Sequence, residues 1–153
     1  MEPKFETKAA FTVIGYKYRG KNEQSEIPQM WGEFMKREGE VKPRPNPDTG
    51  YGVMGNFDKD SGEFDYVAGL EVDPKAETPE GMVRWDIPEA YYAVLPCTLP
   101  TLKDAFDFVC KKWMPESGYQ GTNGPEFEYY PPSFDPQVPD SELLIYIPVI
   151  KKD

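Results

Sequence analysis

The chain has no histidine, only two cysteines and no long apolar run, and each shortage excludes a class of protein. Without histidine, Ser-His-Asp catalysis, Cys-His catalysis and the usual histidine-containing zinc sites are excluded. Cys97 and Cys110 form no CxxC pair, which favours a reducing compartment, and Cys110 lies in a helical pattern that predicts a core position. No segment reaches the length of a membrane span, and the N-terminus is too polar for a signal peptide. We therefore predict a cytoplasmic protein that binds no membrane, metal or cofactor.

Basic residues are also in short supply. Lys and Arg number 17 against 27 Asp and Glu, which leaves a net charge of -10. Such a surface repels phosphate backbones, so direct binding of nucleic acid is disfavoured, while cationic ligands or basic protein surfaces are attracted. The length of 153 residues predicts a single domain over 1–153 with a proper core.

Aromatic residues, by contrast, make up 14% of the chain. The segment PEFEYYPP, residues 125–132, places a carboxylate among rings in a pattern typical of a strand. Alternation puts Glu126, Glu128 and Tyr130 on one face of that strand, and Phe127 and Tyr129 on the other. A carboxylate on an aromatic face suits an apolar cation, because the rings supply area and cation–π attraction and the carboxylate supplies the countercharge. The alternative is a surface strand with solvated glutamates.

The apolar patterns predict seven strands and two helices. The strands are expected at 9–18, 51–57, 64–72, 82–85, 91–95, 127–130 and 143–150, and the helices at 25–37 and 101–113. Ser25 is a candidate N-cap for the first helix, and Thr101 with Asp104 resembles a capping box for the second. Pro115 and Gly118 are expected to end the second helix. The order β-α-β-β, repeated once, predicts an α+β fold of two pseudo-symmetric halves, with an antiparallel sheet, two helices on one side and a ligand cleft where the halves meet.

Eight short motifs follow one another in the order and spacing of a known family. They are VIGYKYRG (13–20), EIPQMWGEF (26–34), YGV (51–53), FDYVAGLEV (64–72), IPEAYYAVLPCTL (87–99), WMPESGY (113–119), PEFEYY (125–130) and LLIYIPV (143–149). On these the chain resembles the GyrI-like small-molecule-binding domain, also called the AraC-type effector-binding domain. The resemblance implies two βαββ halves with a pocket at their interface. In multidrug-sensing regulators of this family, the pocket binds lipophilic cations through a buried glutamate and several tyrosines.

The resemblance also implies site residues. Glu128 matches the family's glutamate and Tyr146 its late tyrosine, and Tyr130 shares the face of Glu128. Further tyrosines lie on strands that supply aromatic residues in the family: Tyr51, Tyr66, Tyr91 and Tyr92. The chain departs from the family at Leu144, where many relatives carry an acid, and Glu142 lies on the same strand face. The regulators also carry a DNA-binding module, and the chain begins almost directly with the first strand, so a stand-alone binder or enzyme is expected.

Three functions follow as expectations. The first is binding of lipophilic, often cationic, aromatic compounds, for drug sensing or sequestration, by a monomer or a dimer. The second is hydrolysis of reactive cyclopropane-containing toxins, with Glu128 as general base and Tyr66 or Tyr92 orienting water or donating a proton. The third is a protein–protein interaction with DNA gyrase, as the family name suggests, or with a separate regulator.

Overall fold

The computed structural model describes residues 2–153, which form an α+β fold around one antiparallel sheet. The strands are β1 Lys4–Lys8, β2 Phe11–Gly20, β3 Gly50–Gly55, β4 Phe64–Val72, β5 Val83–Ile87, β6 Ala90–Thr98, β7 Tyr119–Gly121, β8 Glu126–Tyr130 and β9 Glu142–Lys151. The helices are α1 Glu26–Met35, α2 Leu102–Asp107 and α3 Met114–Ser117, with a π-helical turn, Phe108–Trp113, joining the last two. Short 3-10 turns lie at Glu38–Glu40 and Leu99–Thr101.

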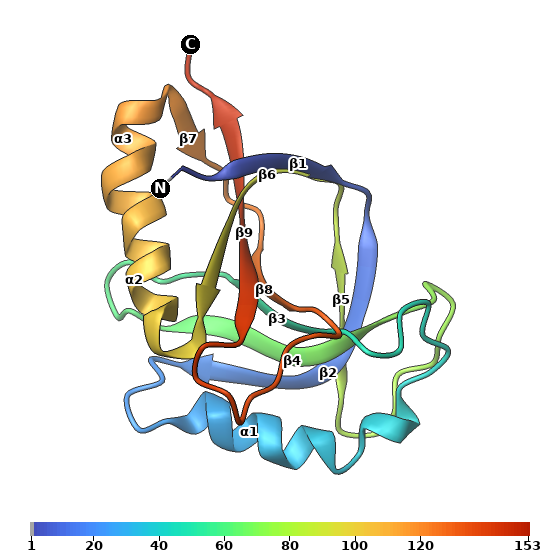
Figure 1. Ribbon diagram of the computed structural model, residues 1–153. Helices are drawn as coiled ribbons and strands as arrows, with labels where there is room; N and C mark the ends of the chain where they lie inside the picture. The colour runs from blue at the N-terminus through green and yellow to red at the C-terminus, as the bar shows by residue number, and fades with distance from the viewer. Residues whose placement is uncertain (1) are drawn as a thin grey trace.

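The strand order β1-β6-β9-β8-β3-β4-β2-β5 places the two predicted βαββ units side by side (Figure 1). One unit consists of β2, α1, β3 and β4, and the other of β6, α2, β8 and β9. They meet where β3 pairs with β8, in a register that sets Gly52 opposite Glu128. The sequence prediction of two similar halves joined in one antiparallel sheet is therefore confirmed.

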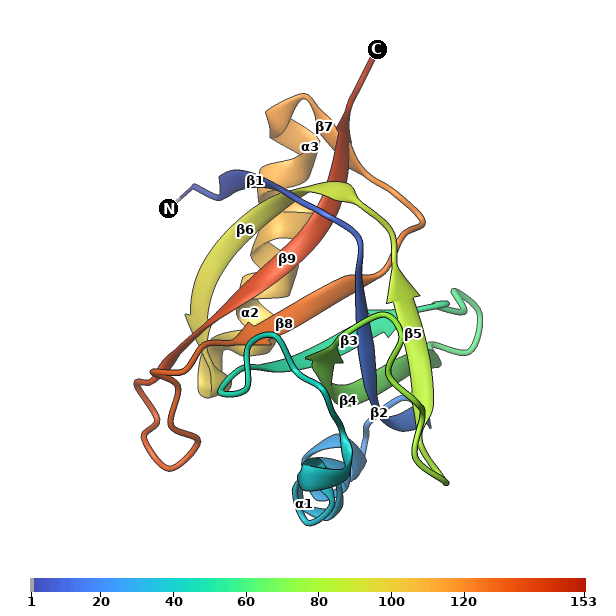
Figure 2. The ribbon, with the colours of Figure 1, turned by 90° about the vertical axis from the view of Figure 1, so that its right-hand side faces the viewer.

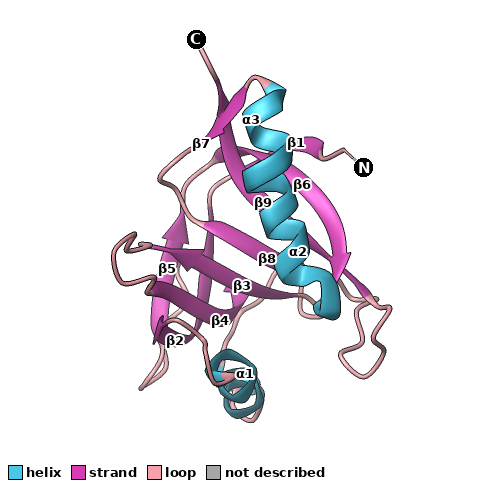
Figure 3. Ribbon diagram, turned by 90° about the vertical axis from the view of Figure 1, so that its left-hand side faces the viewer, coloured by secondary structure: helices cyan, strands magenta, loops and turns pink. Residues whose placement is uncertain are grey.

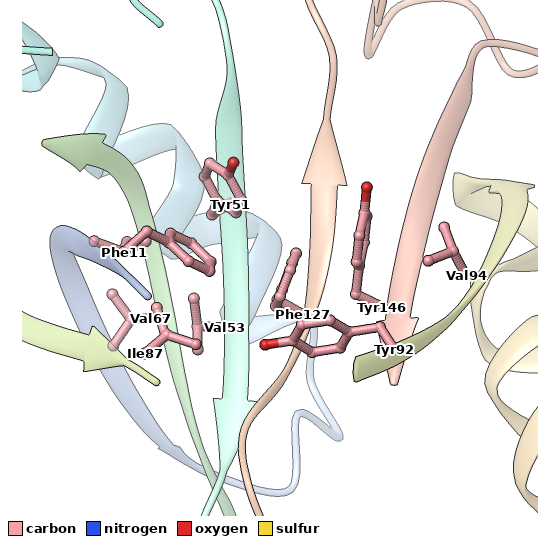
Figure 4. Packing of buried hydrophobic residues seen from close by; sticks show 10 residues of the cluster. Phe11, Tyr51, Val53, Val67, Ile87, Tyr92, Val94, Phe127 and Tyr146 are labelled. Carbon is pink, nitrogen blue, oxygen red and sulfur yellow. The ribbon is translucent and has the colours of Figure 1, made fainter. Parts of the chain in front are cut away.

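The sheet has two different faces. All three helices pack on one of them, which we call the helix face, and Figure 3 shows α2 and α3 in front of β6 and β9. Figure 2, seen from the other side, shows the strands in front of these helices; we call this side the open face. The open face holds a largely aromatic cluster that includes Phe11, Tyr51, Tyr92, Phe127 and Tyr146 (Figure 4). Since side chains alternate along a strand, neighbouring residues serve different faces.

The first helix begins differently from the prediction. Ser25 precedes α1 in a left-handed conformation, with φ of 59°, and its side chain caps nothing. The cap comes from Asn22 instead, whose Oδ1 accepts a hydrogen bond from the backbone N–H of Ile27 at 3.0 Å. An aspartate, asparagine or serine near a helix start is a good signal for a cap, but the sequence does not show which one folds back.

The second helix is longer and less regular than predicted. The hydroxyls of Thr98 and Thr101 form a capping box on the 3-10 turn before α2, so Thr101 closes that turn and does not cap α2 with its side chain. Pro115 lies in α3, directly after the π-helical turn, and the helix continues past it and ends only at Gly118, with φ of 78°. Gly118 is therefore the terminator that the sequence predicts, and Pro115 is not.

Two strands escaped the sequence analysis. The polar segment of β1 alternates too weakly to predict a strand, yet it pairs with β6 from Lys4↔Val94 to Lys8↔Ala90. The three-residue β7 pairs with β9. Cys110, predicted to be buried, is exposed, whereas Cys97 is buried. Within residues 2–153, every helix is too short or too polar to cross a membrane.

Candidate functional site

Glu128 lies at the centre of the sheet, on the helix face. It pairs with Gly52 of β3 on one side and Ile145 of β9 on the other, at the junction between the halves. Only 5% of its surface is exposed. A carboxylate at such a depth is costly unless hydrogen bonds or a positive charge compensate for lost water.

Hydrogen bonds from aromatic side chains supply that compensation. Tyr66 Oη, from β4, donates to Oε1 of Glu128 at 2.8 Å, and Tyr130 Oη, from β8 itself, donates to the same oxygen at 2.7 Å. Trp31 of α1 donates its Nε1–H to Tyr66 Oη, also at 2.8 Å. Trp31, Tyr66 and Glu128 thus form a chain of hydrogen bonds, which we call the relay, that runs from α1 to one carboxylate oxygen. No Lys or Arg among residues 2–153 forms an ion pair with this carboxylate.

The burial of this group changes its ionisation. Burial raises the pKa of Glu128 to about 7, although the hydrogen bonds from Tyr130 and Tyr66 oppose the rise. Glu126, two residues earlier on the same face, has its pKa raised to about 7 by burial and by the nearby charge of Glu128. The pKa values of Tyr66 and Tyr130 lie well above the ordinary tyrosine value, so both remain hydrogen-bond donors at neutral pH. A cation placed here would replace the proton on the carboxylate.

A glycine makes room for the relay. A Cβ built at Gly52 would overlap Tyr66 Oη and lie 2.5 Å from Oε1 of Glu128, whereas a Cβ at Gly50 would meet Trp31 at an ordinary 3.7 Å. The backbone of β3 therefore has to approach the relay closely at Gly52.

We expect Gly52→Ala to destabilise the protein by about 1–3 kcal/mol, because the extra methyl overpacks a buried, hydrogen-bonded site. Urea denaturation measures the loss, and Gly50→Ala on the same strand face serves as the matched control. Equal stabilities of the two variants would contradict the close approach.

The structure separates the predicted tyrosines into two groups. Tyr66 and Tyr130 donate hydrogen bonds to Glu128, and of these two only Tyr130 was placed on its face by strand alternation. Tyr51, Tyr92 and Tyr146 lie on the open face instead, around Phe127 (Figure 4). The ring of Phe127 is 4.6 Å from Tyr146 and 5.2 Å from Tyr92, centroid to centroid. Because Phe127 and Glu128 are consecutive strand residues, these rings and the carboxylate are on opposite sides of the sheet.

The open face has a cavity lined mainly by aromatic side chains. A space of about 210 Å³ is lined by Lys8, Asn46, Tyr51, Phe127, Tyr129 and Tyr146. Tyr51 Oη donates to Oε1 of Glu71 at 3.3 Å. Burial, with the nearby Glu71, raises the pKa of Tyr51 above its usual range, and burial with Glu6 does the same for Tyr146. Tyr92, buried without a charged neighbour, has its pKa raised to about 12.

Tyr91 belongs to neither group. It is 40% exposed and stacks on Phe5 of β1 with the ring centroids 5.4 Å apart. Leu144 packs against the open-face cluster, so an acid at that position would face the cavity and not Glu128. Glu142, on the same strand face, is exposed.

Sequence reasoning missed three contributors: Trp31, Glu71 and Lys8. Trp31 follows a helical stripe, which predicts a core residue, and nothing in the pattern distinguishes an indole that donates to a tyrosine. The sequence pattern around Glu71 is typical of a solvated strand residue. Only the pairing of Tyr51 with Gly69 brings it beside that ring. Lys8 lies in the unpredicted strand β1.

Known proteins resemble this chain in sequence and in fold. The chain is 35% identical over 152 residues to the transcriptional regulator BrlR of Pseudomonas aeruginosa, with 97% of this chain aligned. The match spans 56% of the length of BrlR. Among solved structures, SAV2435 bound to tetraphenylphosphonium superimposes with a TM-score of 0.77 at 17% identity, over 98% of this chain and 94% of that one.

An integron cassette protein of Vibrio cholerae, VCH_CASS2, superimposes with a TM-score of 0.69 at 18% identity, over 97% of this chain and 96% of its own. At these identities the two structures show the shared fold. The family model for Cass2, described as integron-associated effector binding protein, matches residues 4–149. The chain therefore belongs to the Cass2 family of integron-associated effector-binding proteins.

Proposed function

We propose that this protein binds small lipophilic cations as effectors, with Glu128 as the countercharge. The observation that carries the proposal is a carboxylate that is 5% exposed and has aromatic hydroxyl partners but, among residues 2–153, no basic partner. An ionised carboxylate in that setting gains most from a cation that brings its own apolar surface. Membership of an effector-binding family and the tetraphenylphosphonium bound to SAV2435 support this class of ligand.

Aromatic rings close the site toward solvent. The Tyr130 ring lies 5.6 Å from Trp31 of α1 and 4.8 Å from Phe134 in the loop after β8, centroid to centroid. These rings are partly exposed, so they form the outer wall of the site. A multi-ring cation that reaches Glu128 has to part them, and they then supply the stacking surface for it. Directional contacts are few, which favours a broad range of ligands.

The likeness to BrlR supports a regulatory role for the proposed binding. BrlR is a transcriptional regulator, and this chain matches 56% of its length. We infer that effector binding here serves regulation, through the part of the fold that the two proteins share. The charge of -10 makes the described surface a poor partner for DNA.

The pH dependence of binding tests this proposal directly. A proton and a ligand cation compete for Glu128, whose pKa is about 7. Between pH 8 and pH 6 the apparent affinity of wild type for tetraphenylphosphonium should therefore fall by roughly tenfold, as the protonated fraction rises. Calorimetric titration at constant ionic strength measures the change. An affinity that is flat between these pH values would show that the cation does not bind at Glu128.

Hydrolysis is the second candidate, because the same pKa of about 7 suits a general base near neutral pH. Tyr66 can orient a water beside Glu128, since its hydroxyl lies 2.8 Å from Oε1. Tyr92 cannot share that role, because it lies on the open face. Product formation from a reactive cyclopropane-containing compound, lost in Glu128→Gln, would support an enzyme; unchanged substrate would leave binding as the function.

A further inference from the structure

The edge strand β1 is uncovered along its outer side. The strand order ends at β1, and within residues 2–153 its only neighbour in the sheet is β6 (Figure 1). Residues 4–7 are exposed, and Lys8 is half-buried. The outer backbone N–H and C=O groups of such a strand are available to another strand. Folded proteins usually block an edge of this kind, so the side chains of β1 determine what can pair with it.

An aromatic strip lies beside this edge on the helix face. The Phe5 ring stacks on Tyr91 with the centroids 5.4 Å apart, and lies 4.9 Å from Tyr119 and 5.8 Å from Trp113. Phe5 and Tyr91 are 39% and 40% exposed. Rings that contact one another and remain open to water form an apolar patch, and such patches mark contact surfaces in soluble proteins.

The charges of β1 match those of a second copy of the same strand. In an antiparallel pair centred on Phe5, Lys4 lies opposite Glu6 of the second copy, and Glu2 lies opposite Lys8. Two-fold symmetry repeats both pairs and brings the two Phe5 rings together on the helix face. A pair centred on Glu6 would instead set Lys4 against Lys8, which is repulsive. The sequence of β1 therefore favours one register with itself.

The other edge strand, β5, carries a similar alternation, but its charges are already satisfied. Arg84 and Asp86 form an ion pair within β5 at 3.0 Å, and Asp86 also accepts a hydrogen bond from Thr12 at 2.8 Å. In β1, by contrast, neither Lys4 nor Glu6 forms an ion pair with any of residues 2–153. Their charges are available to a second copy.

We propose that β1 is a homodimer surface, through which two copies pair antiparallel about Phe5 and join their sheets into one. Each Lys4 then faces a Glu6, and the two aromatic strips become continuous. A lysine on an edge strand opposes pairing unless an acid faces it, so these charges select the register. Glu128 lies on β8, separated from β1 by β6 and β9, so the dimer does not depend on the proposed ligand site.

The dimer is expected to be weak. The strand pair is short and buries little area, which is typical of transient association. The net charge of -10 on each copy opposes association at long range. Salt at about 0.15 M confines that repulsion to roughly 8 Å. Sedimentation velocity at this ionic strength should therefore detect a concentration-dependent dimer of wild type between about 10 and 500 µM.

Reversing one charge at a time tests the register. Lys4→Glu and Glu6→Lys should each weaken the dimer by about tenfold or more, because each turns two attractive cross-strand pairs into repulsive ones. Glu6→Lys also makes the protein less negative, so a contact governed by general charge would be strengthened by it. Lys59→Glu, in the turn between β3 and β4, makes the same change in net charge as Lys4→Glu and should stay within about twofold of wild type.

Mixing the two variants restores the complementary charges. Lys4→Glu and Glu6→Lys together should form a heterodimer within about threefold of the wild-type affinity, because every glutamate again faces a lysine. The double variant Lys4→Glu/Glu6→Lys should recover in the same way. Circular dichroism checks that each variant is folded, since Glu6 also lies beside Tyr146.

Hydrogen exchange of wild type needs no variant. The outer amides of residues 4–8 should exchange severalfold more slowly at about 500 µM than at about 10 µM, whereas amides of β5 should not change. A wild type that stays monomeric over this range would overturn the proposal. A dimer that Lys4→Glu does not weaken, or a mixture no stronger than its components, would do so too, because the contact would lie elsewhere. Each of these results leaves the binding of tetraphenylphosphonium at Glu128 to its own tests.

Discussion

Glutamine in place of Glu128 is expected to weaken the binding of tetraphenylphosphonium by about a hundredfold or more. Losing one partner of a buried ion pair costs about 3–5 kcal/mol, and each 1.4 kcal/mol is a factor of ten in affinity. Glutamine keeps the shape of the side chain and an oxygen that accepts from Tyr66 and Tyr130, which now donate at 2.8 and 2.7 Å. The variant therefore removes charge and leaves the aromatic wall intact. Fluorescence titration with a rhodamine cation provides a second ligand for the same comparison.

Glu126→Gln is the matched control for this experiment. Glu126 lies on the same strand face, two residues from Glu128, and its pKa is raised to about 7 as well. The Glu126→Gln variant makes the same change in net charge but leaves the hydroxyl partners of Glu128 untouched. We therefore expect its affinity for tetraphenylphosphonium to fall by less than about threefold, which is the size of a weak charge effect. If both variants lose binding equally, the general negative field attracts the cation and Glu128 has no special role. If Glu128→Gln binds as tightly as wild type, the proposal of Glu128 as countercharge is wrong.

Strand alternation was sufficient to predict the local arrangement around Glu128. The period of two placed Glu126, Glu128 and Tyr130 together and turned Phe127 and Tyr129 away, and the contacts agree: Tyr130 donates to Glu128, and Phe127 stacks on Tyr146. This inference needs only one strand. The order of strands and helices likewise predicted the two halves, because βαββ units repeat in the apolar pattern.

The pairing between distant strands could not be predicted in the same way. The resemblance assigned Tyr146 to the same pocket as Glu128. Tyr146 lies on the other side of the sheet, because the register of β8 with β9 sets Phe127 opposite Tyr146. A shift of one residue in that register would exchange the faces, and no local signal fixes it. The family resemblance supplied residue positions without supplying faces, so it merged two sets of tyrosines into one expected pocket.

The second consequence of the buried carboxylate is a stability that depends on pH in an unusual direction. The pKa of Glu128 rises from 4.5 to about 7 on folding, so the folded state holds its proton more tightly than the unfolded state does. The stability that this provides is fully present below about pH 4.5 and is lost as the pH rises through about 7. At 1.36 kcal/mol per unit, the loss approaches about 3 kcal/mol by pH 8.

Urea denaturation of wild type and Glu128→Gln at pH 4, 6 and 8 isolates this contribution. Glutamine does not titrate, so the difference in unfolding free energy should shift by about 3 kcal/mol in its favour between pH 4 and pH 8. Carboxylates with lowered pKa values, such as Asp65 beside Asn56 and Arg19, give the opposite trend, but they are common to both proteins and cancel. A difference that does not change with pH would mean that Glu128 ionises normally in the folded state.

Ligand binding connects the affinity measurement with the stability measurement. Saturating tetraphenylphosphonium should restore the stability of wild type at pH 8, because the cation replaces the lost proton, and should do so far less at pH 4, where the proton is already there. In Glu128→Gln the cation should add little at either pH. Ionised Glu128 destabilises the empty protein, and a bound cation removes that destabilisation. Ligand binding would therefore be measurable as a rise in the free energy of unfolding.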